Sequence, residues 1–200
     1  MNPSGPQLHL ASRSPRRAEL LRLLGVEFVV VDVEVDEDPR AGEAPAAYVR
    51  RVAEDKARAG GARLARDAAV LAADTTVSID GEIFGKPRDA ADAQAMLTRL
   101  AGRWHEVYTA VVVGIRSERF VDVVKTRVEF KSLSVATIAA YWRSGEAADK
   151  AGAYGIQGLG GALIKRIDGS YGAVVGLPLC ETVTLLDRAG IRHALTPPPD

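Results

Sequence analysis

The sequence predicts an α/β fold built on a mixed sheet, because short β-rich segments alternate with amphipathic helical segments along the chain. The two β-rich segments 107–114 and 120–130 are separated only by a short turn, which predicts an antiparallel pair. No internal repeat and no linker divides the 200 residues. We therefore expect one domain spanning 1–200, with frayed ends at 1–6 and 196–200.

Composition limits the partners and the location of the protein. Lys and Arg total 26, as do Asp and Glu, so no net field attracts nucleic acid or a membrane, and neither is expected as a partner. We find no secretion signal at the N-terminus and no apolar run near the roughly 20 residues of a membrane span. The one cysteine, Cys180, suits a reducing compartment, so we expect a cytoplasmic protein. Cys180 lies in the apolar run 174–183, which predicts a buried structural thiol.

The first strand, 8–11, leads into a basic helix start. Ser14 is placed to cap this helix and Pro15 to occupy its first turn, and Gly25 ends it. Free amides, a positive helix end, the Ser12 hydroxyl and three arginines meet here, and together they favour an anion. The alternative is a solvated basic helix start.

A strand at 28–31 is followed by the acidic run 32–38, which reads mostly as a solvated loop. One or two of its carboxylates could face the arginines or a divalent cation. Pro45 then opens a helix expected from 46 to about 65, because apolar residues recur there at helical spacing. Lys56 lies on this helix, and the pattern alone favours a surface lysine.

The central segment begins with an apolar strand, 69–73, that delivers Asp74 at its C-terminal end. Two threonines, a half-buried strand, a tight turn at 80–81 and a short return to Lys86 follow. A carboxylate can hold a metal ion or take a proton from water, and an ammonium can face phosphate charge. The segment therefore suits chemistry on a phosphate, although an ordinary hairpin with a solvated Asp74 is the alternative.

The second half contains a segment that argues against regular structure, with five glycines between 152 and 161. It matches neither a Walker loop nor a dinucleotide fingerprint. Backbone amides in such a loop can approach a ligand closely, with Gln157 among the polar side chains beside them. The other elements expected are helices at 89–100 and 181–189, a helix that Ser134 is placed to cap, and a strand at 163–167.

Five blocks of the sequence together resemble the Maf family of nucleoside triphosphate pyrophosphatases: LASRSPRRAELL, VLAADTTV, GKPRD, DKAGAYGIQG and GSYGAVVGLPLCET. The resemblance implies a single Maf-like domain, similar in fold to inosine triphosphate pyrophosphatases, with an elongated mixed sheet flanked by helices and two lobes around a cleft. It implies a hydrolase that uses a divalent metal cation, Mg²⁺ or Mn²⁺. Relatives are often dimers, so the resemblance also allows a homodimer.

The resemblance assigns roles that the pattern alone leaves open. Asp74 matches the family's catalytic aspartate and, with Glu37, is an expected metal ligand, while Asp36 stays open as an alternative to Glu37. Arg13 departs from the Gly or Glu that relatives often carry, which alters the charge of the phosphate site. The expected substrate-binding residues are Ser12, Arg16, Arg17, Lys56, Thr75, Lys86 and Gln157.

The segment 149–158 keeps both the lysine and the glutamine of the branch that prefers dTTP and UTP. The resemblance ties Arg16, Thr75 and Gln157 to base choice. The Gln157 amide can offer a donor and an acceptor to O4 and N3–H of thymine or uracil, and a bidentate contact discriminates bases by roughly 1–3 kcal/mol. The expected reaction is hydrolysis of dTTP, UTP or modified pyrimidine nucleotides to the monophosphate and pyrophosphate.

Two other functions are weighed against this one. The family name comes from septum formation, which suggests a regulatory or binding protein in cell division with little catalysis. An intact Asp74 with both lysines argues against an inactive enzyme. A nucleotide kinase or transferase would need a Walker loop, which the sequence lacks.

Overall fold

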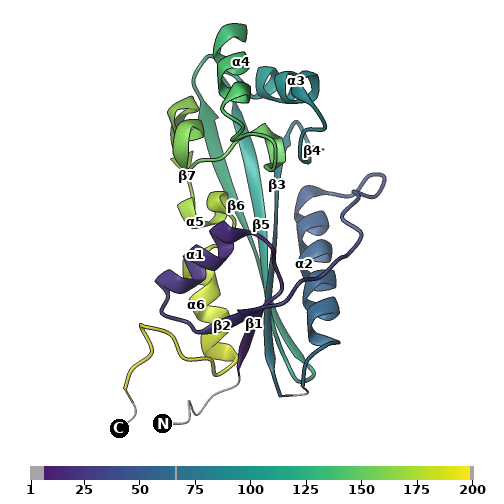
Figure 1. The fold of residues 1–200 in the computed structure, drawn as a ribbon, viewed down its shortest axis with the longest axis vertical. Coiled ribbons are helices and arrows are strands. Elements are labelled where there is room, and N and C mark those ends of the chain that lie inside the picture. Colours follow the sequence, from purple (N-terminus) through teal and green to yellow (C-terminus); the bar gives the residue numbers. More distant parts are fainter. Residues whose placement is uncertain (1–6, 66, 199–200) are drawn as a thin grey trace.

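A seven-stranded mixed sheet runs the length of the elongated molecule (Figure 1). The computed structural model describes residues 7–65 and 67–198. Of the predicted frayed ends at 1–6 and 196–200, residues 1–6 and 199–200 lie outside the described residues, whereas Thr196 is hydrogen-bonded to His193. The strands are β1 (Leu8–Leu10), β2 (Phe28–Val30), β3 (Ala69–Ile79), β4 (Glu82–Phe84), β5 (Trp104–Ile115), β6 (Glu118–Phe130) and β7 (Ile164–Asp168). The helices are α1 (Pro15–Leu23), α2 (Pro45–Gly61), α3 (Ala90–Leu100), α4 (Val135–Arg143), α5 (Tyr171–Val175) and α6 (Leu179–Arg188), with short 3₁₀ segments η1 (Ala151–Ala153) and η2 (Gly158–Leu163). The predicted α/β class and mixed sheet are confirmed.

The sheet has an opening along one edge of β3. The strand order is β2-β1-β3-β5-β6-β7, with β4 beside β3. β1 pairs in parallel with β2 and β3, and the predicted antiparallel pairing of β5 with β6 is confirmed. On the edge away from β5, β1 covers residues 69–71 of β3 and β4 covers residues 77–79. Within the described residues, 72–76 have no strand partner on that edge.

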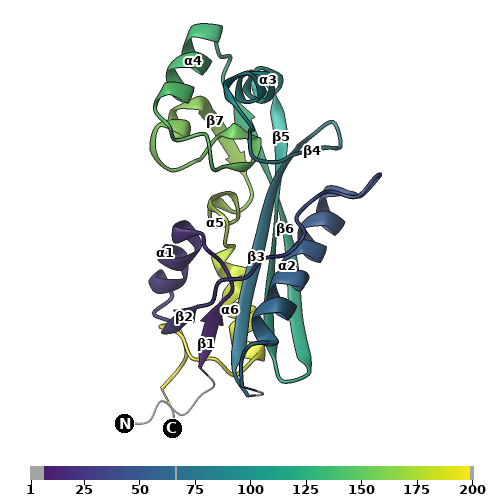
Figure 2. The same ribbon diagram turned by 45° about the vertical axis from the view of Figure 1, so that its right-hand side comes forward.

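The pleat of β3 sends alternate residues into two layers of helices. Leu71 and Ala73 join the apolar cluster formed with α1 and α6, whereas Val70 and Ala72 join the cluster formed with α2. Figures 1 and 2 show α2 on one face of the sheet and α1, α5 and α6 on the other. A third cluster packs α3, α4 and η1 against the far end of the sheet. The order of the side chains along β3 therefore decides which layer each one meets.

Local sequence explains where several elements begin and end. The Ser14 hydroxyl accepts a hydrogen bond from the Arg17 amide at the start of α1, and Ser134 caps α4 in the same way, so both predicted caps are confirmed. Asp80 and Gly81 both have positive φ, 56° and 80°, which suits the two-residue turn between β3 and β4. In the described part of the chain, no helix is long and apolar enough to cross a membrane.

The prediction that Asp74 ends a strand is wrong. The predicted strands at 69–73 and 77–79 are a single strand, β3, and Asp74 lies in its middle. The polar residues do not interrupt the strand because Asp74, Thr75 and Thr76 all pair with residues of β5 on the other edge. Tertiary pairing here overrides the loss of local apolar character.

Other predictions are wrong at element boundaries and on the surface. α2 ends at Gly61 rather than near 65, because two glycines disfavour continuation of the helix. Cys180 is exposed rather than buried, since it lies in the first turn of α6, whose buried side chains begin at Thr182. The elements α5, η1 and η2 were not predicted, because none spans the two turns that reveal helical periodicity.

The glycine at 152 gives a stability prediction. Gly152 has φ +67°, and a Cβ there would lie 2.8 Å from the Val77 side chain, whereas Gly145 has φ +77° with nothing within 4 Å. Both alanine variants carry left-handed strain of about 1–2 kcal/mol, but only Gly152→Ala adds overpacking of about 1–3 kcal/mol. In urea unfolding, the free energy of unfolding of Gly152→Ala should therefore be lower than that of Gly145→Ala by about 1–3 kcal/mol. Equal unfolding free energies would contradict the close packing of η1 on β3.

Candidate functional site

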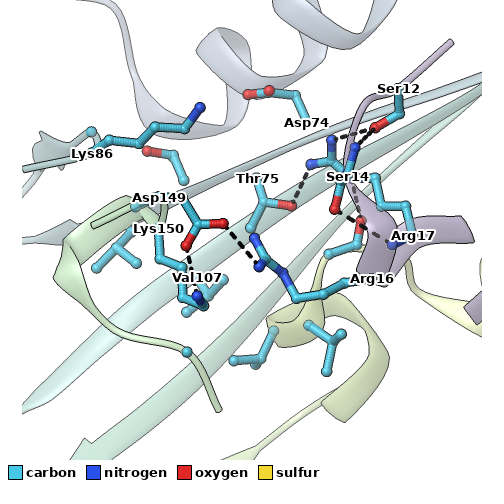
Figure 3. A pocket seen from close by; sticks show the side chains of 18 of the residues that line it. Ser12, Ser14, Arg16, Arg17, Asp74, Thr75, Lys86, Val107, Asp149 and Lys150 are labelled. Carbon is cyan, nitrogen blue, oxygen red and sulfur yellow. Dashed lines mark hydrogen bonds and ion pairs between the residues drawn. The ribbon is translucent and has the colours of Figure 1, made fainter. Parts of the chain in front are cut away.

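A cavity of about 1030 Å³ lies beside the opening in the sheet, between the ends of β1 and β4. Figure 3 shows Asp74 and Thr75 reaching it from β3, with Arg16 and Arg17 of α1 across from Lys86. All predicted site residues line this cavity, namely Ser12, Arg16, Arg17, Glu37, Lys56, Asp74, Thr75, Lys86 and Gln157. The structure thus brings together residues that are separated by up to 145 positions in the chain (157 − 12).

Asp74 and Thr75 enter the cavity from opposite faces of the sheet, because consecutive strand residues alternate. Asp74 follows Ala72 on the face covered by α2, and Thr75 follows Ala73 on the face covered by α1. Both can line one cavity because the edge of β3 is open at these residues. The cavity therefore has one wall that carries the carboxylate and another that carries the hydroxyl.

Lys56 is buried at the centre of the first wall, so the surface position that pattern alone favours is wrong. Its side chain is only 11% exposed, because it lies on the face of α2 that packs on β3. The ammonium lies 2.8 Å from Asp74 Oδ1 and 2.8 Å from Glu37 Oε1. The Tyr48 hydroxyl donates to the Glu37 carbonyl at 2.8 Å and holds that loop in place. The Lys56 ammonium thus bridges Glu37 and Asp74, the two predicted metal ligands.

The two carboxylates differ in electrostatics. Burial raises the pKa of Asp74, and the charges of Lys56 and Arg17 only partly oppose this effect. Burial also acts to raise the pKa of Glu37, but the hydrogen bond and charge of Lys56, then the charge of Lys86, outweigh it and lower the pKa. Asp74 Oδ2 is buried and has no hydrogen-bond partner among the described residues. The free oxygen of Asp74 is therefore the better proton acceptor of the two groups.

Arg17 ties the basic helix start to both neighbouring elements. Its guanidinium donates to Ser12 Oγ at 3.3 Å, to Thr75 Oγ1 at 3.2 Å and to the Gly176 carbonyl at 2.9 Å. Burial lowers the pKa of Arg17, and the charges of Asp74 and Glu37 oppose this shift. A guanidinium stays protonated under such conditions, so it supplies a fixed positive charge.

Arg16 crosses the cavity, where its Nη1 lies 3.2 Å from Asp149 Oδ2. Lys150 Nζ contacts the other oxygen of Asp149 at 2.7 Å. Arg13 also lines the cavity, but its side chain is 63% exposed and pairs at 2.9 Å with Asp32, which does not line it. The added charge of Arg13 is therefore largely compensated outside the site.

The remaining predicted residues are less constrained. Lys86 and Gln157 are exposed at the cavity mouth, and neither makes a side-chain hydrogen bond or ion pair with any residue that the structure describes. Asp36 accepts a hydrogen bond from the Asp38 amide and does not line the cavity, so the geometry favours Glu37 over Asp36 as the acidic site residue.

The donor set can be tested against a divalent cation. No cluster of three or more His, Cys, Asp or Glu side chains forms a metal cage within 7–65 and 67–198. Glu37 and Asp74 supply two carboxylates, and the unpartnered Asp74 Oδ2 leaves one oxygen available. Mg²⁺ is typically held by one or two carboxylates together with phosphate oxygens and water. The residues present therefore fit such a cation when a phosphate ligand completes the coordination.

Two residues of the site were missed by the sequence reasoning. Glu146 accepts hydrogen bonds from the amides of Leu159 and Gly160 and from the Tyr141 hydroxyl, so it holds the glycine segment at the cavity wall. Thr109 lies behind Thr75 at 2.9 Å. Neither belongs to a recognisable pattern, and only the folded chain brings them to the site.

The sequence of this chain also matches known proteins. Residues 7–189 match the family described as Maf-like protein. A dTTP/UTP pyrophosphatase of Methylobacillus flagellatus is 54% identical over 186 residues, covering 92% of this chain and 94% of that protein. A dTTP/UTP pyrophosphatase of Vibrio cholerae is 53% identical over 182 residues, covering 91% of this chain and 97% of that protein.

Two solved structures also resemble this chain. The Ham1 protein of Staphylococcus aureus matches with a TM-score of 0.44 and 16% identity, covering 62% of this chain and 71% of that one. A nucleoside-triphosphatase, or dITP/XTP pyrophosphatase, of Mycobacterium abscessus matches with a TM-score of 0.43 and 18% identity, covering 92% and 95%.

The Lys56 pair gives a prediction for stability and its pH dependence. Lys56→Met should lower the free energy of unfolding by about 3–5 kcal/mol near neutral pH, because Asp74 is left charged and buried. Arg50→Met on the same helix removes an exposed pair with Glu54, so it should lose less than about 1 kcal/mol. Urea unfolding from about pH 4 to about pH 8 measures both variants.

The sign of the pH dependence follows from the two carboxylates. A raised carboxyl pKa favours the folded state below the unfolded pKa, and this advantage is lost as pH rises through the folded value. Without Lys56 the pKa of Asp74 rises further, while Glu37 loses a stabilisation that exists only above its own unfolded pKa. The loss in free energy of unfolding caused by Lys56→Met should therefore grow from acidic to neutral pH. A deficit that grows on acidification would contradict this account.

Proposed function

This chain belongs to the Maf family, and on that premise we propose that it hydrolyses dTTP and UTP to the monophosphate and pyrophosphate. Relatives that are 53–54% identical over 91–96% of this chain are named dTTP/UTP pyrophosphatases, which supports an enzyme rather than a regulatory protein in cell division. The chain is then a hydrolase that acts on the phosphoanhydride of a nucleoside triphosphate. Modified pyrimidine nucleotides that keep the same base edge are also within its reach.

One observation carries the proposal, namely the buried carboxylate of Asp74, in which Oδ1 contacts Lys56 and Oδ2 has no hydrogen-bond partner within residues 7–65 and 67–198. Asp74 orients the attacking water and takes its proton through Oδ2. The water oxygen joins phosphorus, the α–β bridge breaks and pyrophosphate leaves. Burial raises the pKa of Asp74 and so makes it a stronger base than an exposed carboxylate.

Fixed positive charges surround the region where the triphosphate would lie. Lys56 and Arg17 are held by several protein contacts, whereas Lys86 is exposed and can follow the ligand. These groups neutralise the charge that moves onto the departing pyrophosphate. The Ser12 hydroxyl and the amides at the start of α1 bind phosphate oxygens.

A divalent cation, Mg²⁺ or Mn²⁺, is part of the proposal. Glu37 and Asp74 would hold it together with phosphate oxygens, and when bound it draws electron density from the phosphoryl group. The lowered pKa of Glu37 keeps this side chain ionised and ready as a ligand.

The base would lie on the other side of Thr75, where Arg16 and Gln157 also line the cavity. The Gln157 amide can donate to O4 of a pyrimidine, and Arg16 is positioned by Asp149. The single cysteine supports a cytoplasmic location, where such nucleotides are found.

Asp74→Asn tests the proposal. The variant should still bind dTTP, because the positive charges are unchanged, but its kcat should fall by about 10²–10⁴ since the base is lost. Asp122→Asn is a matched control, because Asp122 is exposed on β6 and its carboxylate accepts, among the described residues, only from the neighbouring Val123 amide. Binding is measured by calorimetry, and products are separated by ion-exchange chromatography.

The products decide between outcomes. The parent protein and Asp122→Asn should release pyrophosphate and monophosphate in equal amounts. Release of orthophosphate, or no product in the presence of Mg²⁺ or Mn²⁺, would contradict the proposed reaction. Turnover by Asp74→Asn at the parental rate would contradict only the role proposed for Asp74.

A further inference from the structure

The hydroxyl of Thr75 belongs to a chain of hydrogen bonds whose direction is fixed. Thr109 Oγ1 donates its only hydrogen to the Ala173 carbonyl at 2.7 Å. Thr109 must therefore accept in its 2.9 Å contact with Thr75, and Thr75 Oγ1 must donate. Arg17 Nη2 donates to Thr75 Oγ1 at 3.2 Å. With its hydrogen committed and one lone pair used, Thr75 offers the cavity only an acceptor.

We propose that Thr109 is a specificity-determining positioning residue, which fixes Thr75 as an acceptor for the N3–H group of thymine and uracil and so excludes cytosine. Thr109 does not line the cavity and acts only through Thr75. The inference rests on the proposed function, because it concerns how the same site chooses its nucleotide.

The surroundings of Thr75 suit a base rather than phosphates. Thr75 shares its face of the sheet with Val77 and, on the neighbouring strand, with Val107. Ile156 and Val174 also line the cavity, so this wall is apolar. The carboxylates and Lys56 lie on the opposite face of β3. An apolar wall with one oriented acceptor is complementary to the flat face and the N3–H edge of a pyrimidine.

The sequence ties base choice to Gln157 together with Arg16 and Thr75, and Gln157 alone cannot provide this discrimination. Its side chain is exposed and has no hydrogen-bond partner in the described part of the chain. A free amide can turn over, so it presents its donor and acceptor in either order and serves uracil or cytosine equally. The Thr75 hydroxyl cannot turn over, because Thr109 and Arg17 occupy its hydrogen and one lone pair.

Cytosine would therefore meet a mismatch at Thr75. Its N3 carries a lone pair where uracil and thymine carry a hydrogen, so two acceptors would face each other. Thr109 is fully buried, with an exposed fraction of 0%, so no water can replace its hydroxyl. The unmatched polar groups should lower kcat/KM for dCTP relative to that for dTTP by about fivefold to tenfold or more.

Thr109→Val tests the inference. Valine keeps the shape but leaves the Thr75 hydroxyl free to rotate and to donate to N3 of cytosine. The ratio of kcat/KM for dTTP to that for dCTP should fall about fivefold to tenfold. The ratio of the dissociation constants, measured by calorimetry without added divalent cation so that turnover is suppressed, should shift in parallel. Thr109→Ser restores a hydroxyl at the same place and should keep the parental ratios.

Thr126→Val is the matched control. Thr126 is also a fully buried strand threonine, and its hydroxyl bonds the backbone of Ser170, close to Ala173 in sequence. This variant loosens the same segment but leaves the Thr75 chain intact. It should change stability without changing the dTTP to dCTP ratio.

The outcomes separate the inference from the proposed function. A parent protein that binds dTTP more tightly than dCTP but hydrolyses neither contradicts the proposed function alone. A parental ratio kept by Thr109→Val, a ratio lost in Thr126→Val as well, or a parent protein that does not prefer dTTP contradicts the inference. A change confined to the preference between ribose and deoxyribose would place Thr75 at the sugar and would also overturn it.

Discussion

The buried contact between Lys56 and Asp74 is the interaction on which the rest of the site depends. An isolated ammonium or carboxylate at this depth would be strongly destabilising, so each group requires the other. The pair joins α2 to the middle of β3, and Glu37 adds a third charge from the preceding loop. Three segments that are distant in sequence are thereby fixed around one oxygen of Asp74, while its other oxygen accepts no hydrogen bond from any residue that the structure describes.

The opening in the sheet gives this pair its access to a ligand. β1 ends before residue 72 of β3, and β4 begins only at residue 77, so the strand edge between them faces the cavity. Continuous pairing along this edge would bury Asp74 and Thr75 on separate sides of the sheet. The opening instead lets the anionic wall and the apolar wall face one ligand, with Arg17 between them.

Much of the fold follows from patterns that are local in sequence. The caps at Ser14 and Ser134, the turn at 80–81 and the pairing of β5 with β6 depend on neighbouring residues, and the structure confirms them. The continuity of β3 depends on its pairing with β5. The polar side chains in the middle of β3 hide this continuity from the sequence pattern. Likewise, the spacing along α2 places Lys56 on a helix, but its burial depends on Asp74 eighteen positions away. Thr109 and Glu146 act through contacts that have no sequence signature, so the sequence predicts the residues that line the cavity but not those that orient them.

Asp74 and Thr75 are consecutive residues of one extended strand, so β3 fixes the spacing of their backbone atoms. In the proposed function these residues carry the reacting carboxylate and the hydroxyl that meets the base, and the spacing of about 3.8 Å between their Cα atoms is set by covalent geometry. No hinge between the two groups can lengthen or shorten that span. Under the proposed function, changes behind Thr75 can therefore alter base choice without changing the backbone spacing between Thr75 and Asp74.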